Sequence, residues 1–255
     1  MRILLAAMLC AKGDVAANLA EHRRLLGAAA AAGCDLALFP EMSLTGSVDP
    51  AAHPGRLMRL GNPAVAGLAR AAADAGVAAC FGVAERAAGG AAHITQVVAA
   101  GGRVTGLQRK RHLGDGEEAF TPADPAAGAP VLEHAGVRFA IAICAEAHYD
   151  APFDAAAAAG AGLVLFPAAP GLYGRRTSAA SWRDGFAWWE GSALGDARRH
   201  ARRRGLWIAL AGQAGSTADE DFPGLAAVVS PAGTVTGRLP DWRAGTLVAD
   251  VPLGA

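Results

Sequence analysis

The stretch NPAVAGLARAAADAGVAACFGVAERAAGGAAHITQVVAAGGRVTGLQ, residues 62–108, contains a helix, a strand and a hairpin in one continuous segment. Asn62-Pro63 is a typical helix start, because Asn caps the first turn and Pro fits its first position, and Gly76 is a typical stop. Three strand-like segments follow, at 77–83, 94–99 and 104–108. Gly101-Gly102 joins the last two as a hairpin, and a hairpin next to a βα unit predicts a mixed sheet covered by helices.

The flanking sequence continues this alternation of strands and helices. Upstream, the apolar run 3–9 predicts a buried strand, Asp14 can cap a helix that ends near Gly33, and 35–39 predicts a second strand. A hairpin with Gly136 at its turn is expected downstream. The elements expected there are strands 131–134 and 137–143, a helix over about 152–159, a strand at 163–166, a long helix ending near Arg204, and strands 206–211, 226–229, 235–239 and 247–251.

The N-terminal residues also resemble a bacterial lipoprotein signal, with Arg2, a short apolar run and Cys10. The run 3–9 is at the lower length limit of a signal core, and the amphipathic segment after Asp14 needs a strand before it. These features favour a buried strand. No run approaches the ~20 apolar residues of a membrane span, so we expect a cytoplasmic protein without a membrane partner.

Composition excludes two broad classes of protein. Of the 255 residues, 53% are hydrophobic and 18% charged, so the chain can bury enough surface to offset its ordering entropy and is not disordered. The 23 basic and 23 acidic residues give a net charge of zero, whereas a nucleic-acid binder would carry a clustered basic excess. No linker, repeat or change of composition marks a boundary, so we expect one domain over 1–255.

Cysteine and lysine usage narrows the function further. The four cysteines lie far apart without a CxxC pair, a pattern typical of a reducing compartment. Only two of the 23 basic residues are lysines, Lys12 and Lys110. A lysine ammonium is a compact point charge whose pKa shifts on burial, so a lysine kept among arginines is a candidate for chemistry. The alternative for Lys110 is a solvated basic run with Arg109 and Arg111.

Three reactive side chains follow predicted strands. They are Glu41 after LALFP, Lys110 after VTGLQR, and Cys144 after VRFAIAI. Hydrolysis of an amide-type bond needs a nucleophile, a base for its proton and a cation where negative charge develops, best presented beyond the ends of buried strands. Each residue also has a plain alternative, a solvated carboxylate for Glu41 and a small core residue for Cys144.

Taken together, these residues carry a resemblance to a known family. LFPEMSLTG (38–46), RKRHL (109–113) with EEAFTP (117–122), and AICAE (142–146) with GAGLVLFP (160–167) resemble the signature blocks of the nitrilase superfamily, the carbon–nitrogen hydrolases. The blocks occur in the order and at the spacing of that family. The resemblance implies an α/β fold, a four-layer α-β-β-α sandwich of two mixed sheets, assembled as a homodimer or higher oligomer.

The resemblance also implies roles for individual residues. Glu41 would be the general base, Lys110 the oxyanion stabiliser, Cys144 the nucleophile, and the Ala145 N–H a second oxyanion donor. Many members have a further glutamate before the Phe-x-Pro of the lysine block. Both glutamates of the EEAF sequence compete for that position, namely Glu117 and Glu118.

A further set of residues is expected around the substrate: Ala145, His148, Ala168, Tyr173 and Arg175. The segment 171–195, rich in Arg and Trp, is either a pocket wall in which Arg175 grips a substrate carboxylate, or a packed helix with its Trp at a subunit interface. His148 lies four residues after Cys144, but such a local match is more often accidental than a Cys–His pair.

The implied activity is thiol-dependent hydrolysis of a small linear amide or carbamoyl amide, through a thioester on the cysteine. Nitrile hydrolysis, acyl or amino transfer at the same site, and a catalytically silent binding protein are the alternatives. No metal or organic cofactor is required, and Asp219-Glu220-Asp221 is interpreted as a solvated turn rather than a metal site. The expected partner is a small-molecule substrate, not nucleic acid.

Overall fold

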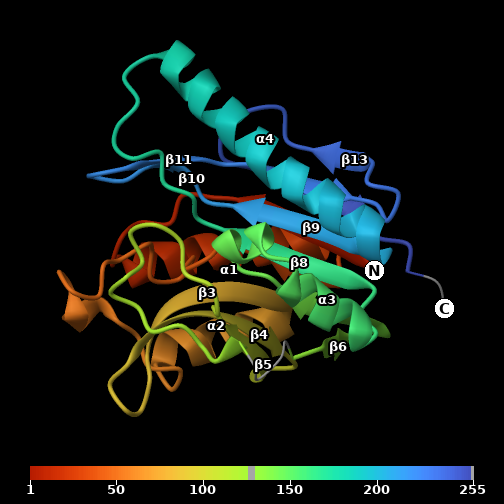
Figure 1. Cartoon of the computed structure of the whole chain (residues 1–255). Helices are drawn as coiled ribbons and strands as arrows, with labels where there is room; N and C mark the ends of the chain where they lie inside the picture. Colours follow the sequence, from red (N-terminus) through yellow and green to blue (C-terminus); the bar gives the residue numbers. More distant parts are fainter. Residues whose placement is uncertain (126–129, 254–255) are drawn as a thin grey trace.

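Two mixed β-sheets face each other in the computed structural model, which describes residues 1–125 and 130–253 (Figure 1). The helices are α1 (Val15–Ala31), α2 (Pro63–Ala75), α3 (Ala151–Ala158) and α4 (Ala179–Arg204). The strands are β1 (Arg2–Ala7), β2 (Leu36–Leu38), β3 (Ala78–Arg86), β4 (Ala92–Ala100), β5 (Arg103–Arg109), β6 (Leu132–His134), β7 (Val137–Ile141), β8 (Leu163–Ala168), β9 (Trp207–Gly212), β10 (Ala214–Ser216), β11 (Asp221–Pro223), β12 (Ala226–Val229), β13 (Val235–Arg238) and β14 (Gly245–Asp250).

The two sheets have the same internal plan. The first has the strand order β14-β1-β2-β3-β4-β5, with β1, β2 and β3 parallel and the outer pairs antiparallel. The second has the order β13-β12-β9-β8-β7-β6, with β7, β8 and β9 parallel. Helices make the parallel crossovers, as such connections require. The ends of β2 and β7, where reactive residues were predicted, therefore belong to different sheets.

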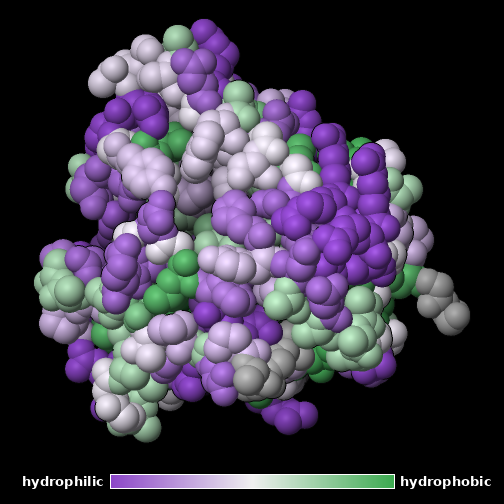
Figure 2. All heavy atoms as spheres, viewed as in Figure 1, coloured by the Kyte–Doolittle hydropathy of each residue, from purple (hydrophilic) through white to green (hydrophobic). Residues whose placement is uncertain are grey.

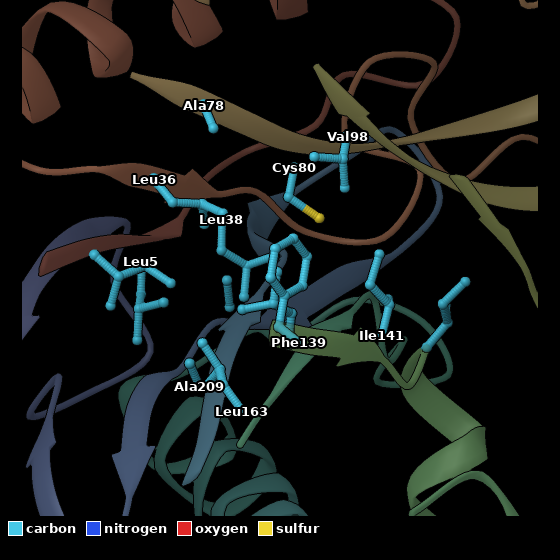
Figure 3. Packing of buried hydrophobic residues seen from close by; sticks show 14 of the residues in the cluster. Leu5, Leu36, Leu38, Ala78, Cys80, Val98, Phe139, Ile141, Leu163 and Ala209 are labelled. Atoms are coloured by element: carbon cyan, nitrogen blue, oxygen red, sulfur yellow. The ribbon is translucent and has the colours of Figure 1, made fainter. Parts of the chain in front are cut away.

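Alternating side chains divide the core into three layers. In β1, Ile3 and Leu5 face the opposite sheet, whereas Leu4 and Ala6 pack with α1 and α2. The same alternation in β8 sends Leu163 toward the first sheet and Val164 toward α3 and α4. Figure 3 shows side chains from both sheets meeting in the central layer. The α-β-β-α sandwich expected from the resemblance is confirmed.

The predicted helix ends are confirmed by their capping geometry. The Asp14 side chain accepts from the Ala17 N–H at 3.0 Å, and Asn62 accepts from the Ala64 N–H at 2.8 Å. Gly76 and Gly205 follow α2 and α4 with φ values of 66° and 67°, the left-handed conformation that glycine adopts without steric cost.

One interpretation of the sequence is corrected by the fold. Asp221 does not lie in a solvated turn: it begins β11 and is fully buried. Its carboxylate pairs with Arg175 Nε at 3.1 Å and accepts from the Arg176 N–H, so the buried charge is compensated. The β10–β11 hairpin was not predicted, because three-residue strands leave too little alternation to detect.

Helix α4 is the longest element of the described chain and runs along the outside of the second sheet (Figure 1). Figure 2 shows a hydrophilic surface over its C-terminal half. There Arg203 and Arg204 pair with Asp150 at 2.8 and 3.0 Å, and Arg199 pairs with the same carboxylate at 2.9 Å. None of the helices described, α4 included, is long and apolar enough to cross a membrane.

The central layer predicts a large cost for truncating Leu163. The side chain is fully buried between the sheets, so Leu163→Ala should lower the free energy of unfolding by about 2–5 kcal/mol through lost burial and a residual cavity. Denaturant unfolding measures this. Val104→Ala, on the 38% exposed Val104, is the control and should change stability by no more than about 0.5 kcal/mol. Equal effects of the two variants would contradict the layered core.

Candidate active site

Glu41, Lys110 and Glu117 form one buried ionic cluster beside Cys144. Lys110 Nζ donates to Glu41 Oε1 at 2.8 Å and to Glu117 Oε1 at 2.6 Å. The side chains of Lys110 and Glu41 are almost fully buried, and that of Glu117 is 15% exposed. The structure thus brings together the three predicted strand-end residues and one of the two competing glutamates.

Glu41 is held by both sheets. Glu41 follows β2 of the first sheet. Its Oε2 accepts at 3.0 Å from the N–H of Ala169, which lies just beyond β8 of the second sheet. The chain turns sharply after it, with Met42 at a φ of 49°. A Cβ on Gly82 of β3 would lie 2.1 Å from the Met42 nitrogen, so only glycine lets this turn approach the strand.

Buried polar residues that the sequence did not indicate support this turn. Ser43 Oγ accepts from the Gly82 N–H at 3.1 Å and lies 3.0 Å from His22 Nε2. The other ring nitrogen of His22 is 2.7 Å from the Asn18 carbonyl. Burial lowers the pKa of His22 to about 4, so the imidazole is neutral and structural. The sequence indicated this support only through the position of His22 on the apolar face of the helix that follows Asp14.

Cys144 begins a 3-10 helix, Cys144–His148, with an unusual φ of 45°. Fully buried Glu146 stabilises this turn, because its Oε2 accepts from the Ile143 N–H at 2.8 Å. Its Oε1 accepts from the Arg111 N–H at 2.8 Å and pairs with Arg111 Nε at 3.2 Å. Glu146 therefore fixes Cys144 relative to Lys110. The sequence placed it in the cysteine block without suggesting this role.

The protonation states follow from burial and neighbouring charge. Burial lowers the pKa of Lys110, but the negative charges of Glu41 and Glu117 outweigh it and raise the pKa above its usual value, so the ammonium persists. Burial raises the pKa of Glu41, and Lys110 opposes the shift. Burial and the Glu41 charge raise the pKa of Cys144 well above its usual value, so the resting group is a thiol.

A cavity of about 520 Å³ opens over these groups. Its wall includes Lys110, Glu117 and Cys144, together with apolar side chains such as Phe120 and Trp189. Of the residues predicted around the substrate, Ala145, His148 and Tyr173 line it. The wall also holds Trp188, from the segment 171–195 for which a pocket wall was one of two interpretations. Three further wall residues were not singled out for this site by the sequence: Lys12, Tyr149 and Phe222.

Three predicted site residues lie elsewhere. Ala168 is fully buried on the face of β8 that packs against the helices, and the strand alternation brings Ala169 to the cavity instead. Arg175 donates to the Thr217 carbonyl at 2.9 Å and pairs with Asp221, so its guanidinium is used by the β10–β11 hairpin. The exposed Glu118 accepts from the Gly116 N–H, away from Lys110.

His148 is on the cavity wall but is directed to α4. Its Nδ1 lies 2.8 Å from Asp196 Oδ2, and its side chain is 57% exposed. This geometry agrees with the view that its spacing from Cys144 is accidental. Within 1–125 and 130–253, no group of three His, Cys, Asp or Glu side chains is arranged to hold a metal ion.

Comparisons with known proteins place the chain in a family. The carbon–nitrogen hydrolase family model matches residues 4–255, so the chain belongs to that family of enzymes. No curated protein matches it. An amidase from Nesterenkonia sp. has a structure that superposes with a TM-score of 0.84 and 28% identity, covering 99% of this chain and 90% of that one.

Further structures of the Nesterenkonia sp. AN1 amidase match equally well. A glutamate-to-glutamine mutant, with the acetamide moiety of fluoroacetamide added covalently at its active-site cysteine, has a TM-score of 0.84, 28% identity and coverage of 99% and 90%. A cysteine-to-serine mutant, described as an amidase from the nitrilase superfamily, has the same TM-score and identity with coverage of 99% and 92%. The solved structures most similar to this chain thus include amidases of that superfamily.

The thiol state of Cys144 predicts an unusual pH dependence of alkylation. Because its pKa is raised by burial and by Glu41, the thiolate fraction should keep growing beyond the pH at which an exposed thiol, with a pKa of about 8.5, is fully ionised. The rate of iodoacetamide addition, followed by intact mass, should therefore still rise above about pH 10.5, where an exposed thiol is already about 99% ionised. Cys144→Ala controls for the buried Cys10, Cys34 and Cys80. A rate that levels off near neutral pH would show a resting thiolate instead.

Proposed function

We propose that this protein hydrolyses a small linear amide or carbamoyl amide to an acid and ammonia or an amine, through a thioester on Cys144. The observation that carries the proposal is the Lys110 ammonium, buried between Glu41 and Glu117 on the wall of the cavity that holds Cys144. A base, a cation and a nucleophile are thereby held beside one space that a substrate can enter.

Acylation begins with the protonated thiol. Glu41 accepts the thiol proton as Cys144 sulfur attacks the carbonyl carbon, so a C–S bond forms and the carbonyl electron pair moves onto oxygen. The raised pKa of Glu41 suits it to this proton transfer. Collapse of the tetrahedral intermediate breaks the C–N bond, and Glu41 returns the proton to the departing nitrogen. The products of this half-reaction are ammonia, or an amine, and the thioester.

Lys110 and the Ala145 N–H stabilise the negative oxygen in this mechanism. The ammonium has a persistent charge and is fixed by two carboxylates, so it needs no reorganisation as the oxyanion forms. Glu117 positions Lys110, and its own Oε2 is held by the Gly114 N–H at 2.6 Å. Water then attacks the thioester with Glu41 as base, which releases the acid and restores the thiol.

The structurally similar amidases support an amide rather than a nitrile as the substrate of this protein. In the glutamate-to-glutamine mutant of the Nesterenkonia sp. AN1 amidase the acetamide moiety of fluoroacetamide is bound covalently at the active-site cysteine, and in a second structure of the same mutant acrylamide has added there. We further propose that residues 1–255 act as one catalytic domain in a cytoplasmic homodimer or higher oligomer. The four free thiols agree with a reducing compartment.

The proposal predicts ammonia release that depends on Cys144. Wild type and Cys144→Ala are incubated with a panel of linear amides, carbamoyl amides and nitriles, and ammonia is measured. The wild type should release ammonia from at least one amide, the variant from none, and intact mass should detect an acyl adduct on the wild type alone. Ammonia production that survives in Cys144→Ala would overturn the mechanism. Release only from nitriles, or adducts passed only to amines, would favour the alternative activities.

Glu117 and Glu118 are adjacent in the sequence, but their positions predict different effects of substitution on kcat. Glu117→Gln removes the carboxylate that fixes Lys110 and should lower kcat by about 100-fold, because small misplacements of a catalytic charge are costly. Glu118→Gln changes an exposed carboxylate that accepts from the Gly116 N–H instead, so kcat should stay within about 2-fold. Steady-state kinetics on one amide measures both. A larger loss in Glu118→Gln would assign the second site glutamate to that position.

A further inference from the structure

The cavity has room for more than the reacting amide group. Its volume of about 520 Å³ lies in the range of sites for ligands much larger than a two- or three-carbon amide. A substrate that fills it must carry a chain beyond the scissile carbon. The charges and aromatic rings on the wall then determine what that chain carries.

Every cation on the described wall is already paired with carboxylates. Lys110 lies between Glu41 and Glu117 at 2.8 and 2.6 Å. Lys12, the only other lysine of the chain, is 2.8 Å from Asp219 and 3.7 Å from Glu220.

His148 is similarly paired with Asp196, and Arg175, predicted to grip a substrate carboxylate, is paired with Asp221 away from the wall. Arg56 belongs to an adjoining hollow and donates to the Lys12 carbonyl at 3.5 Å. Among the described residues that line the cavity, there is therefore no unpaired cation that a substrate carboxylate could bind.

Two carboxylates on the wall are not paired in this way. Asp49 and Asp115 are exposed, line the cavity and form no ion pair within the described part of the chain. The Asp49 carboxylate accepts the Ala51 N–H at 2.8 Å. They lie on separate loops, one after Glu41 and one before Glu117. Because a cleft with walls of low dielectric concentrates the field of its charges, the cavity mouth attracts a cation.

Aromatic side chains provide an independent indication. Tyr149, Tyr173 and Trp188 line this same cavity, and they are 45%, 77% and 50% exposed. The described chain has two other exposed large apolar side chains, Leu9 and Val104. Exposed aromatic faces bind an alkyl chain by burial and an ammonium group by cation–π attraction, whereas the negative potential of the ring face repels a carboxylate.

We propose that the substrate is an amide or carbamoyl amide whose chain ends in an ammonium group, and that the cavity discriminates against amides bearing a carboxylate. This inference rests on the proposed function and names its substrate class. Lys110, Glu117 and Cys144 act on the amide, the aromatic side chains contact the alkyl chain, and the carboxylates of Asp49 and Asp115 attract the ammonium.

A matched series of substrates tests the inference. δ-Aminovaleramide, hexanamide and the monoamide of glutaric acid have similar lengths and carry a positive, a neutral and a negative end. We expect kcat/KM to decrease in that order, with the cationic amide at least about 10-fold above the anionic one at low salt and a smaller ratio at high salt. Equal values, or preference for the glutaric monoamide, would overturn the inference.

Failure of the inference and failure of the proposed function give different results. If hexanamide is hydrolysed and acylates Cys144 while the cationic amide has no advantage, only the substrate class is wrong. If no member of the series or of the wider amide panel releases ammonia or forms an adduct, the proposed function and the inference are both overturned.

Substitution of the two unpaired carboxylates makes the test specific. Asp49→Asn and Asp115→Asn keep the side-chain shape, and Asn can still accept the Ala51 N–H at position 49. Each should lower the kcat/KM ratio of δ-aminovaleramide to hexanamide by about 2–5-fold. Asp74→Asn removes an exposed carboxylate on α2, outside the cavity, and should leave the ratio unchanged. An unchanged ratio in the Asp49 and Asp115 variants alike would refute their role.

Discussion

The ammonium of Lys110, buried between Glu41 and Glu117, is the interaction on which the site depends. Burying a charge away from water costs free energy unless opposite charges and hydrogen bonds compensate it. Lys110 is paired with carboxylates from two separate loops. Glu41 in turn accepts the Ala169 N–H from the second sheet. Removing Lys110 would leave the carboxylates of Glu41 and Glu117 without their cation. The cluster therefore requires both sheets to be in register across the central apolar layer.

The second lysine of the chain has surroundings similar to those of the first. Lys12 and Lys110 both line the cavity, and each ammonium lies between two carboxylates. A compact ammonium with three donors fits such a position, whereas a planar guanidinium needs the room of a bidentate partner. Arginine takes the surface pairs instead, as between α4 and Asp150. The cavity wall and the outer surface thus use different cations.

Residues close together in sequence were predicted well. The helix caps at Asp14 and Asn62 and the turn glycines act within a few residues of themselves, so their patterns carry the information directly. Ala168 and Arg175 were misplaced because their roles depend on other elements. Strand alternation directs Ala168 to the helices, and a buried carboxylate on an unrecognised hairpin takes the guanidinium of Arg175. Glu146 was overlooked because its partners on Arg111 lie 35 positions away.

The sequence by itself determined a mixed sheet covered by helices, through apolar periodicity, and the three strand-end residues. Its three ordered motifs carried the family resemblance, which implied the sandwich. Periodicity and motifs are local properties of the chain. Only the tertiary structure decided that Glu117 rather than Glu118 contacts Lys110, that Cys144 rests as a thiol, and that both lysines of the cavity wall are paired with carboxylates. Each of these depends on burial and on charges brought together from distant segments. Electrostatic energy varies with distance and dielectric, and neither is a property of sequence spacing.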